Sequence, residues 1–267
     1  MSDIALVAID MDGTLLTSKG ELPPKNVEAI RRCSNQGIRI VLATTRNPNR
    51  VADYCRQLGI NDPMICTNGA QIWASPDGPV WDYRTLSKSV GLAIATFADQ
   101  RGWELSTTVN QMTYWKQREG QAIGLAKSGL MIVEHNADAM TENPVRILAH
   151  EVDAIREIER LCHEQYADQC SLEVFYEPDG AVHSLVVLAP QTNKRTALEV
   201  VHSHLDISPN NAMAIGDNLN DLSMLTTVGF PVAVGNAIEA VKQAAKVVAP
   251  DNDHDGVAWA LETYVLS

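Results

Sequence analysis

The stretch IALVAIDMDGTL, residues 4–15, decides the fold of this 267-residue chain. Its first half, Ile4–Ile9, is an unbroken apolar run of the kind that forms a strand buried on both faces. Two carboxylates, Asp10 and Asp12, follow the run directly. In a doubly wound α/β sheet, ligands bind beyond the carboxyl ends of the strands, so we expect both carboxylates to face a ligand crevice. The alternative interpretation is that Asp12-Gly13 is only a turn.

Strand and helix signals alternate outward from this motif. Apolar runs predict further strands at 38–43 and 64–67, and proline at the start with glycine at the end predicts the helices between them. The alternation returns after residue 189, with strands predicted at 212–215, 230–234 and 246–249 and helices at 193–204, 219–227, 238–245 and 257–266. This alternation predicts an α/β fold with a doubly wound, parallel-sheet, Rossmann-like core.

The segment between about 84 and 188 has a different pattern. A hairpin is predicted ahead of it, at 71–83. The segment itself carries helix signals at 87–100 and 151–165, strand candidates at 104–109, 111–115, 145–149, 172–176 and 182–188, and a turn at 177–180. We therefore predict a discontinuous core, residues 1–83 and 189–267, into which residues 84–188 are inserted as an α+β cap domain.

A second acidic cluster, from Gly216 to Asp221, follows the predicted strand at 212–215. Asp and Asn are also preferred helix N-caps, so a capped turn is the alternative interpretation here. Together the two clusters bring up to four carboxylates to one crevice, which is unfavourable unless a cation compensates their charge. Carboxylate and carbonyl oxygens are hard ligands, so the ion that we expect is Mg²⁺.

Two single residues would complete a phosphate site. Thr44, just past the strand at 38–43, offers a hydroxyl among backbone N–H groups that can face an anion. Lys194 opens the helix at 193–204 and offers a positive charge to a phosphoryl oxygen. Each residue alone is typical of an ordinary surface position. The function is indicated by their order along the chain relative to the two acidic clusters.

This ordered set resembles the haloacid dehalogenase superfamily of phosphotransferases. The first family motif matches Asp10–Leu15, the second Thr44, the third Lys194, and the fourth Gly216-Asp217 with Asp221. In detail the chain resembles the Cof-type phosphatases, whose large cap is inserted between the second and third motifs. Further stretches similar to that subgroup are Thr67–Ala70, Val234–Ala237 and Asp255–Ala258.

The resemblance implies a mechanism through an aspartyl-phosphate. Asp10 would be the nucleophile and Asp12 the general acid and base. Mg²⁺ would be held by Asp10, the backbone carbonyl of Asp12, Asp217 and, directly or through water, Asp221. The phosphoryl oxygens would be held by the backbone N–H groups of Met11 and Asp12 and by Thr44, Lys194 and Asn220. The candidate substrate-binding residues of the core are Thr45, Arg46 and Asn68, and the cap would close over them as a lid.

Two residues depart from the subgroup pattern. Thr45 stands where glycine usually separates the threonine and arginine of the second motif, and Arg195 stands where glycine commonly follows the lysine of the third. A side chain at Thr45 changes the room beside the phosphate, and Arg195 either adds positive charge or points to solvent. Neither change removes a catalytic group, so both concern substrate fit.

Composition limits the partners and the location. The chain carries 21 Lys and Arg against 33 Asp and Glu, a net charge of −12, which disfavours binding to nucleic acids or anionic membranes. No apolar stretch approaches the ~18 residues that span a bilayer, and no basic region precedes Ile4 as in a signal peptide. Five cysteines without CxxC spacing predict reduced thiols in a cytoplasmic protein. The expected partner is a small phosphorylated metabolite, and the sequence indicates no oligomeric state.

Three functions stay open at this point. The favoured one is Mg²⁺-dependent hydrolysis of small phosphomonoesters, sugar phosphates above all. A sugar phosphomutase would use the same two aspartates, whereas a non-catalytic phosphometabolite sensor would need no nucleophile. A calcium loop over 251–262 is a separate hypothesis, because the spacing of its acids fits an EF-hand. Pro250 argues against it, since an EF-hand needs a helix that leads into the loop.

Overall fold

The computed structural model describes residues 4–118, 120–127, 129–176 and 180–267. The chain divides into two compact units. The first unit, which we call the core unit, contains Met1–Tyr83 and Asn193–Ser267, and the second, the inserted unit, contains Arg84–Thr192.

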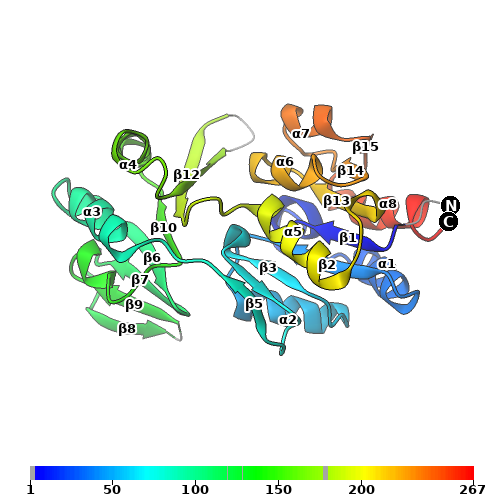
Figure 1. The fold of residues 1–267 in the computed structure, drawn as a ribbon, viewed down its shortest axis with the longest axis horizontal. Coiled ribbons are helices and arrows are strands. Elements are labelled where there is room, and N and C mark those ends of the chain that lie inside the picture. Colours follow the sequence, from blue (N-terminus) through cyan, green and yellow to red (C-terminus); the bar gives the residue numbers. More distant parts are fainter. Residues whose placement is uncertain (1–3, 119, 128, 177–179) are drawn as a thin grey trace. The chain divides into compact units, whose positions relative to one another are not determined.

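The core unit is built on one eight-stranded sheet, and Figure 1 shows its strands together with the helices of this unit. Its strands are β1 (Leu6–Ile9), β2 (Arg39–Ala43), β3 (Met64–Cys66), β4 (Gln71–Trp73), β5 (Val80–Tyr83), β13 (Ala212–Gly216), β14 (Phe230–Ala233) and β15 (Val247–Val248). Their order is β15-β14-β13-β1-β2-β3-β4-β5, and only β4 and β5 run antiparallel to their neighbours. The predicted α/β class with a doubly wound parallel core is therefore confirmed.

Within the described residues, six α-helices accompany this sheet. They are α1 (Pro24–Asn35), α2 (Pro48–Leu58), α5 (Lys194–Leu205), α6 (Leu219–Leu225), α7 (Glu239–Ala244) and α8 (Gly256–Tyr264). One group contains α1 with α2 and α8, and the other contains α6 with α5 and α7. The crossover from β1 to β2 runs along the sheet in the opposite direction from the crossover from β13 to β14. Crossovers between parallel strands are right-handed as a rule, so the two groups of helices are expected to cover opposite faces.

The central strand β1 is buried along its whole length, as its sequence predicts. Leu6, Val7, Ala8 and Ile9 are all fully inaccessible to solvent. Burying side chains of the size of Leu6 and Ile9 stabilises the fold by roughly 1.5–3 kcal/mol each. The five cysteines are also free and buried, in keeping with the expected reduced thiols. Within the described residues, no helix is long and apolar enough to cross a membrane.

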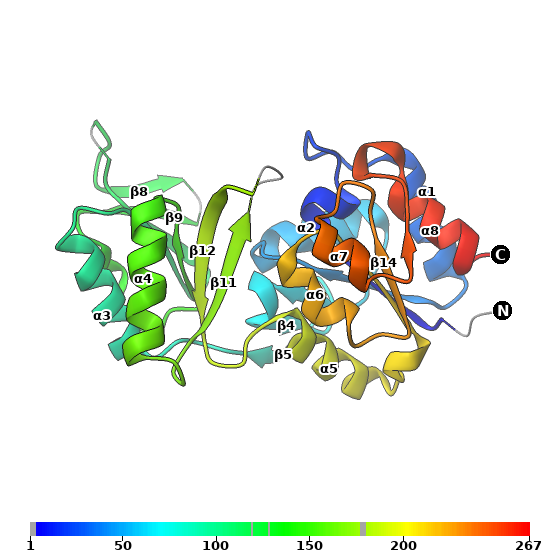
Figure 2. The same cartoon turned by 90° about the horizontal axis from the view of Figure 1, so that it is seen from above.

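In the part of the inserted unit that the structure describes, there are one seven-stranded sheet and two α-helices. In spatial order its strands are β11 (Ser171–Tyr176), β12 (Val182–Leu188), β10 (Arg146–Ala149), β6 (Leu105–Val109), β7 (Met112–Lys116), β9 (Leu130–Val133) and β8 (Gly124–Lys127). The helices α3 (Lys88–Asp99) and α4 (Val152–Gln165) lie side by side, as Figure 2 shows. They share one apolar core with the sheet.

Two strands of the inserted unit, β8 and β9, do not appear among the predicted elements. β8 lies at the edge of the sheet, and the apolar side chains of Ile123 and Leu125 are exposed there, so this strand lacks the alternation that marks a half-buried strand. Most of the predicted turn at 177–180 lies outside the described residues.

Candidate active site

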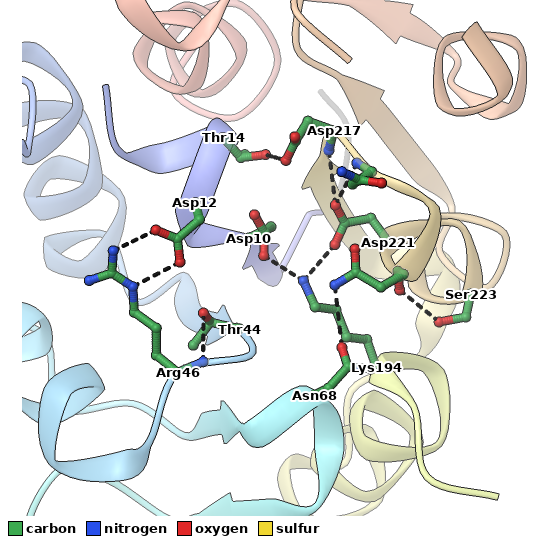
Figure 3. A network of polar contacts seen from close by, with 12 residues as sticks. Asp10, Asp12, Thr14, Thr44, Arg46, Asn68, Lys194, Asp217, Asp221 and Ser223 are labelled. Atoms are coloured by element: carbon green, nitrogen blue, oxygen red, sulfur yellow. Dashed lines mark hydrogen bonds and ion pairs between the residues drawn. The ribbon is translucent and has the colours of Figure 1, made fainter. Parts of the chain in front are cut away.

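Four neighbouring parallel strands bring the predicted site residues together (Figure 3). Asp10 follows β1, Thr44 follows β2, Thr67-Asn68 follows β3 and Asp217 follows β13. These strands lie in the order β13-β1-β2-β3, and the chain leaves β1 in one direction and β13 in the other. A site at the carboxyl ends of strands that diverge in this way is where doubly wound sheets bind ligands.

The turn after β1 fixes the first aspartates. The backbone carbonyl of Asp10 accepts a hydrogen bond from the N–H of Leu15 (3.2 Å), which closes the turn Met11–Leu15. Gly13 has a φ of +82°, a conformation that L side chains rarely adopt. A Cβ on Gly13 would also lie 2.5 Å from Oδ2 of Asp217, so the turn and the aspartate need glycine at this position.

A buried ammonium lies between two of the carboxylates. Nζ of Lys194 is 2.5 Å from Oδ1 of Asp10 and 2.6 Å from Oδ1 of Asp221, and the lysine is fully inaccessible to solvent. Asn193 caps the N-terminus of α5 by accepting from the N–H of Thr196 (2.9 Å), which fixes the position of the first helical residue, Lys194. The sequence predicts this lysine at the start of the helix and beside the phosphate, and in the structure it contacts the nucleophile candidate directly.

Asp221 uses both of its oxygens within the protein. Oδ2 accepts hydrogen bonds from the backbone N–H groups of Asp217 (2.9 Å) and Asn218 (3.0 Å), while Oδ1 faces Lys194. The contact with Asn218 is one half of a capping box at the start of α6. The interpretation of this segment as a capped turn is thus correct as local structure, and it coexists with the carboxylate cluster.

Burial and like charges make the cluster electrostatically unfavourable without a cation. Burial raises the pKa of Asp10 well above its usual range, although the charge of Lys194 acts in the opposite direction. Burial, followed by the charge of Asp221, raises the pKa of Asp217 to about 7. Burial opposes the charge on Lys194, but the attraction of Asp10 and Asp221 outweighs it and raises the pKa of the ammonium.

The carboxylates fit a divalent metal. Asp10, Asp217 and Asp221 each offer an oxygen within 4.8 Å of the others, and among the described residues they are the one such group of three or more metal-ligating side chains. Three carboxylates and one ammonium leave two negative charges, which a divalent cation would neutralise. The donors are all oxygens, as Mg²⁺ prefers. The oxygens of Asp221 are already engaged, which favours contact of this residue with the metal through water.

Asp12 is held apart from this cluster by an arginine. Nε and Nη2 of Arg46 donate to Oδ2 and Oδ1 of Asp12, at 2.8 and 2.5 Å. Nη1 of the same guanidinium donates to the hydroxyl of Tyr54 (2.9 Å), and the hydrogen bonds to Asp12 raise the pKa of Arg46. The sequence predicts separate roles for Asp12 and Arg46, and in the structure the two residues form a bidentate ion pair.

A strained turn lies beside the phosphate-binding candidates. Thr67 and Asn68 both have positive φ, 50° and 55°, and each such residue costs of order 1–3 kcal/mol. The backbone N–H of Asn68 donates to the carbonyl of Thr44 (2.9 Å), and its side-chain oxygen accepts from Nδ2 of Asn220 (3.3 Å). Nδ2 of Asn68 is buried and has no hydrogen-bond partner among the described residues. This amide is therefore a free donor at the site.

The remaining candidates have simpler surroundings. Thr44 is buried, and its hydroxyl accepts from the backbone N–H of Arg46 (3.2 Å), which leaves its own proton for another acceptor. Thr45 is half-buried. Arg195 is exposed and pairs with Glu199 on the same helix (2.9 Å), so of its two predicted roles the solvent-facing one is observed.

Sequence reasoning missed Thr14 and Tyr54. Oγ1 of Thr14 donates to Oδ1 of Asp217 (2.7 Å) and thereby orients a carboxylate 203 positions away. Thr14 belongs to the motif that opens the chain, but its spacing gives no sign of this partner. Tyr54 lies on α2, where its position on the apolar face predicts only packing.

The acidic loop at 251–262 does not assemble a set of calcium ligands. Asp255 pairs with Lys25 (2.8 Å) and Glu262 with Arg32 (3.2 Å). Oδ1 of Asp251 accepts from the backbone N–H of Asp253, as in an ordinary capped turn. No helix leads into the loop; the short strand β15 precedes it.

Comparison with known proteins gives a consistent set of relatives. The family model of haloacid dehalogenase-like hydrolases matches residues 7–261. A putative phosphatase of Haemophilus influenzae is 29% identical over 95% of each chain, and the 5-amino-6-(5-phospho-D-ribitylamino)uracil phosphatase YcsE of Bacillus subtilis is 28% identical over 99% of this chain and 97% of its own. The solved structure of a haloacid dehalogenase-like hydrolase from B. subtilis superposes with a TM-score of 0.83, at 25% identity and with coverage of 98% and 100%.

Proposed function

The chain belongs to the haloacid dehalogenase-like hydrolases and is a phosphatase, and we propose that it hydrolyses small phosphomonoesters through an aspartyl-phosphate, with Mg²⁺ as cofactor. The observation that carries the proposal is the buried cluster of Asp10, Asp217 and Asp221 around Lys194. Phosphoryl transfer at this site requires a nucleophilic carboxylate, a fixed ammonium and an excess of two negative charges that a divalent cation can neutralise.

Asp10 is the nucleophile of the proposed reaction. Its Oδ1 faces Lys194, and its second oxygen attacks phosphorus while the bond from phosphorus to the ester oxygen breaks. Asp12 enters this step protonated on one oxygen, with the other oxygen still held by Arg46, and it gives that proton to the departing oxygen, which leaves as an alcohol. In the second half of the reaction Asp12 takes a proton from water, the water oxygen attacks phosphorus, and the bond to Asp10 breaks to release phosphate. The aspartates return to their initial state.

The phosphoryl group needs several donors at once. Lys194 supplies a positive charge and Asn220 supplies an amide N–H. The hydroxyl of Thr44 accepts a hydrogen bond from the backbone of Arg46, so its own O–H can donate to a phosphoryl oxygen. The backbone N–H groups of Met11 and Asp12 complete the set. Such donors, fixed before the substrate arrives, account for most of the acceleration in phosphoryl transfer.

Mg²⁺ would be held by Asp10, the backbone carbonyl of Asp12 and Asp217, with Asp221 in contact through water. When bound, it would neutralise the carboxylates and draw charge from the phosphoryl oxygens. Thr14 would keep Asp217 oriented toward this position through its hydrogen bond.

The names of the relatives and the remaining polar groups support a proposal for the substrate class. The name of the B. subtilis relative places a phosphate on a ribityl chain, which is derived from a sugar. We propose sugar phosphates and similar primary phosphate esters as substrates, with Thr45, Arg46 and Asn68 as the contacts of the core unit. The inserted unit, Arg84–Thr192, would act as the cap that excludes water and selects the substrate. A cytoplasmic location suits such metabolites.

Phosphate release from a panel of esters tests this function. The panel contains hexose, pentose and glycerol phosphates, pyridoxal phosphate, nucleotides and p-nitrophenyl phosphate, each with Mg²⁺ and with EDTA. We expect release from a subset, with complete loss in EDTA and in Asp10→Asn. Isomerised sugar phosphate without free phosphate would identify a mutase instead. Tight binding of an ester without any product would identify a sensor.

A further inference from the structure

The guanidinium of Arg46 is fixed on two sides. One edge, Nε and Nη2, contacts both carboxylate oxygens of Asp12, and the opposite nitrogen, Nη1, donates to the hydroxyl of Tyr54 (2.9 Å). Figure 3 shows the bidentate contact with Asp12. A guanidinium is planar and rigid, so fixing Nη1 also fixes the direction in which the other edge points.

Asp12 itself has little packing to hold it. Its side chain is 52% exposed, whereas that of Arg46 is 19% exposed. A half-exposed aspartate changes rotamer freely unless a partner restrains it. The arginine is in turn restrained by its backbone, because its N–H donates to Oγ1 of Thr44 and its carbonyl accepts from the N–H of Thr67 (2.9 Å). The backbone contacts of Arg46 therefore restrain its guanidinium, and the guanidinium restrains the side chain of Asp12.

Tyr54 supplies the contact that this arrangement needs at its far end. It lies on α2, the helix that follows Arg46 in the chain. Its hydroxyl accepts a hydrogen bond from Nη1 of Arg46, the guanidinium nitrogen that does not contact Asp12. Loss of that hydroxyl would leave the guanidinium attached to Asp12 but free to rotate with it.

We propose that Tyr54 is a positioning residue for the general acid, and that it acts on Asp12 through Arg46. The inference rests on the proposed phosphatase function, in which Asp12 gives a proton to the departing ester oxygen. Arg46 acquires a second role here, because its contact with Asp12 orients the acid even where no substrate touches the arginine.

The proposal predicts a dependence on the leaving group. An alkoxide leaves poorly and needs a proton from the acid, whereas p-nitrophenolate departs as an anion and does not. The ratio kcat/KM reports the steps up to departure of the leaving group, so it isolates the acid step from the later attack of water. Misplacing Asp12 should thus lower kcat/KM for alkyl phosphates and spare p-nitrophenyl phosphate. Loss of a phosphoryl ligand would lower both equally.

The experiment compares Tyr54→Phe and Arg46→Met in the full chain, with the best alkyl phosphate of the panel and p-nitrophenyl phosphate. We expect Tyr54→Phe to lower kcat/KM about tenfold for the alkyl ester, the effect of one hydrogen bond to a charged group, and less than about twofold for the aryl ester. Arg46→Met should lower the alkyl value about 10²-fold. In the Arg46→Met background, Tyr54→Phe should have no further effect, because the tyrosine acts through the arginine.

Two control variants match these changes at other positions of the same unit. Arg56→Met removes an exposed guanidinium that pairs with Asp53 and Asp77, and Tyr264→Phe removes a hydroxyl on α8. Neither should alter the ratio of the two kcat/KM values. Thermal melting confirms that each variant is folded, and Tyr54→Phe keeps the test available if Arg46→Met does not fold.

The outcomes separate cleanly. Equal losses for both esters would overturn the proposal and make Arg46 and Tyr54 contacts of the phosphoryl group. An unchanged alkyl rate in Tyr54→Phe would overturn it as well. Failure of the phosphatase function looks different, because the unmodified chain would then release no phosphate from any ester.

Discussion

Replacing Lys194 by methionine tests the electrostatic account of the site. The substitution keeps the length of the side chain and removes the charge between Asp10 and Asp221, at 2.5 and 2.6 Å. Breaking a buried ion pair by deleting one partner typically costs 3–5 kcal/mol, because the other partner stays buried without compensation. A typical domain has about 5–15 kcal/mol of stability, so this loss would be a large fraction of the total. We expect an unfolding free energy about 3–5 kcal/mol lower at pH 8 without metal.

The loss should depend on pH with a definite sign. The charge of Lys194 lowers the pKa of Asp10, so its removal raises further a pKa that burial has already raised. A carboxylate whose pKa is raised by folding contributes stability below the unfolded value, near 4, and that stability disappears as pH rises through the folded value. The deficit of Lys194→Met relative to the unmodified chain should therefore be smaller at pH 5 than at pH 8.

Urea unfolding in EDTA, followed by tryptophan fluorescence at pH 5 and pH 8, measures this difference. Lys25→Met is the control, since Lys25 pairs with Asp255 at 2.8 Å on the surface and should lose little stability at either pH. A loss below about 1 kcal/mol at pH 8, within the range of exposed ion pairs, would refute the reasoning. So would an equal loss at both pH values, because protonation of the carboxylates would then play no part.

Three further predictions concern neighbouring residues. Burial raises the pKa of Asp217 to about 7, so the metal-free chain should lose stability as pH rises from about 4 toward 7. Mg²⁺ should therefore raise Tm more at pH 8 than at pH 5, and equal shifts in Tm would contradict this. Gly13→Ala should lower kcat by at least about tenfold, because the added Cβ would displace Asp217. Gly20, at φ +77°, has nothing within 4 Å of an added Cβ, so Gly20→Ala should lower stability but not kcat. An equal loss of kcat in both variants would mean that backbone strain is the cause. Asn68→Ala should lower kcat/KM about tenfold, because it removes a buried free donor beside Asn220, and an unchanged value would show that the amide does not contact the substrate.

The convergence of the main site residues was predictable for a physical reason. Asp10, Thr44 and Asp217 each follow an apolar run, and the carboxyl ends of parallel strands meet at one edge of a sheet. The start of α5 was predictable because Asn193 is a good N-cap, which placed Lys194 at a helix terminus. Local rules of this kind need no knowledge of side-chain packing.

The contacts within the site were not predictable from the sequence. The ion pair between Asp12 and Arg46 depends on which rotamers two loops adopt after folding, and the sequence pattern is the same whether or not they meet. The same holds for Thr14 and its distant partner. The position of Tyr54 on the apolar face of α2 predicts burial. The ring is half-buried, and its hydroxyl accepts a hydrogen bond from Arg46, a contact that hydrophobic periodicity cannot predict.

The two junctions of the inserted unit are unequal, because the second, Thr192–Asn193, lies directly before the helix that begins with Lys194. The first junction, at Tyr83–Arg84, follows the edge strand β5, where extra or missing residues would leave the aspartates undisturbed. At the second junction, an added residue after Asn193 would separate this N-cap from α5, and deletion of Asn193 would remove the cap that fixes the first helical residue, Lys194. If a different cap is grafted onto this core, the first junction should therefore tolerate changes in length, whereas the residues at the second junction should be kept unchanged.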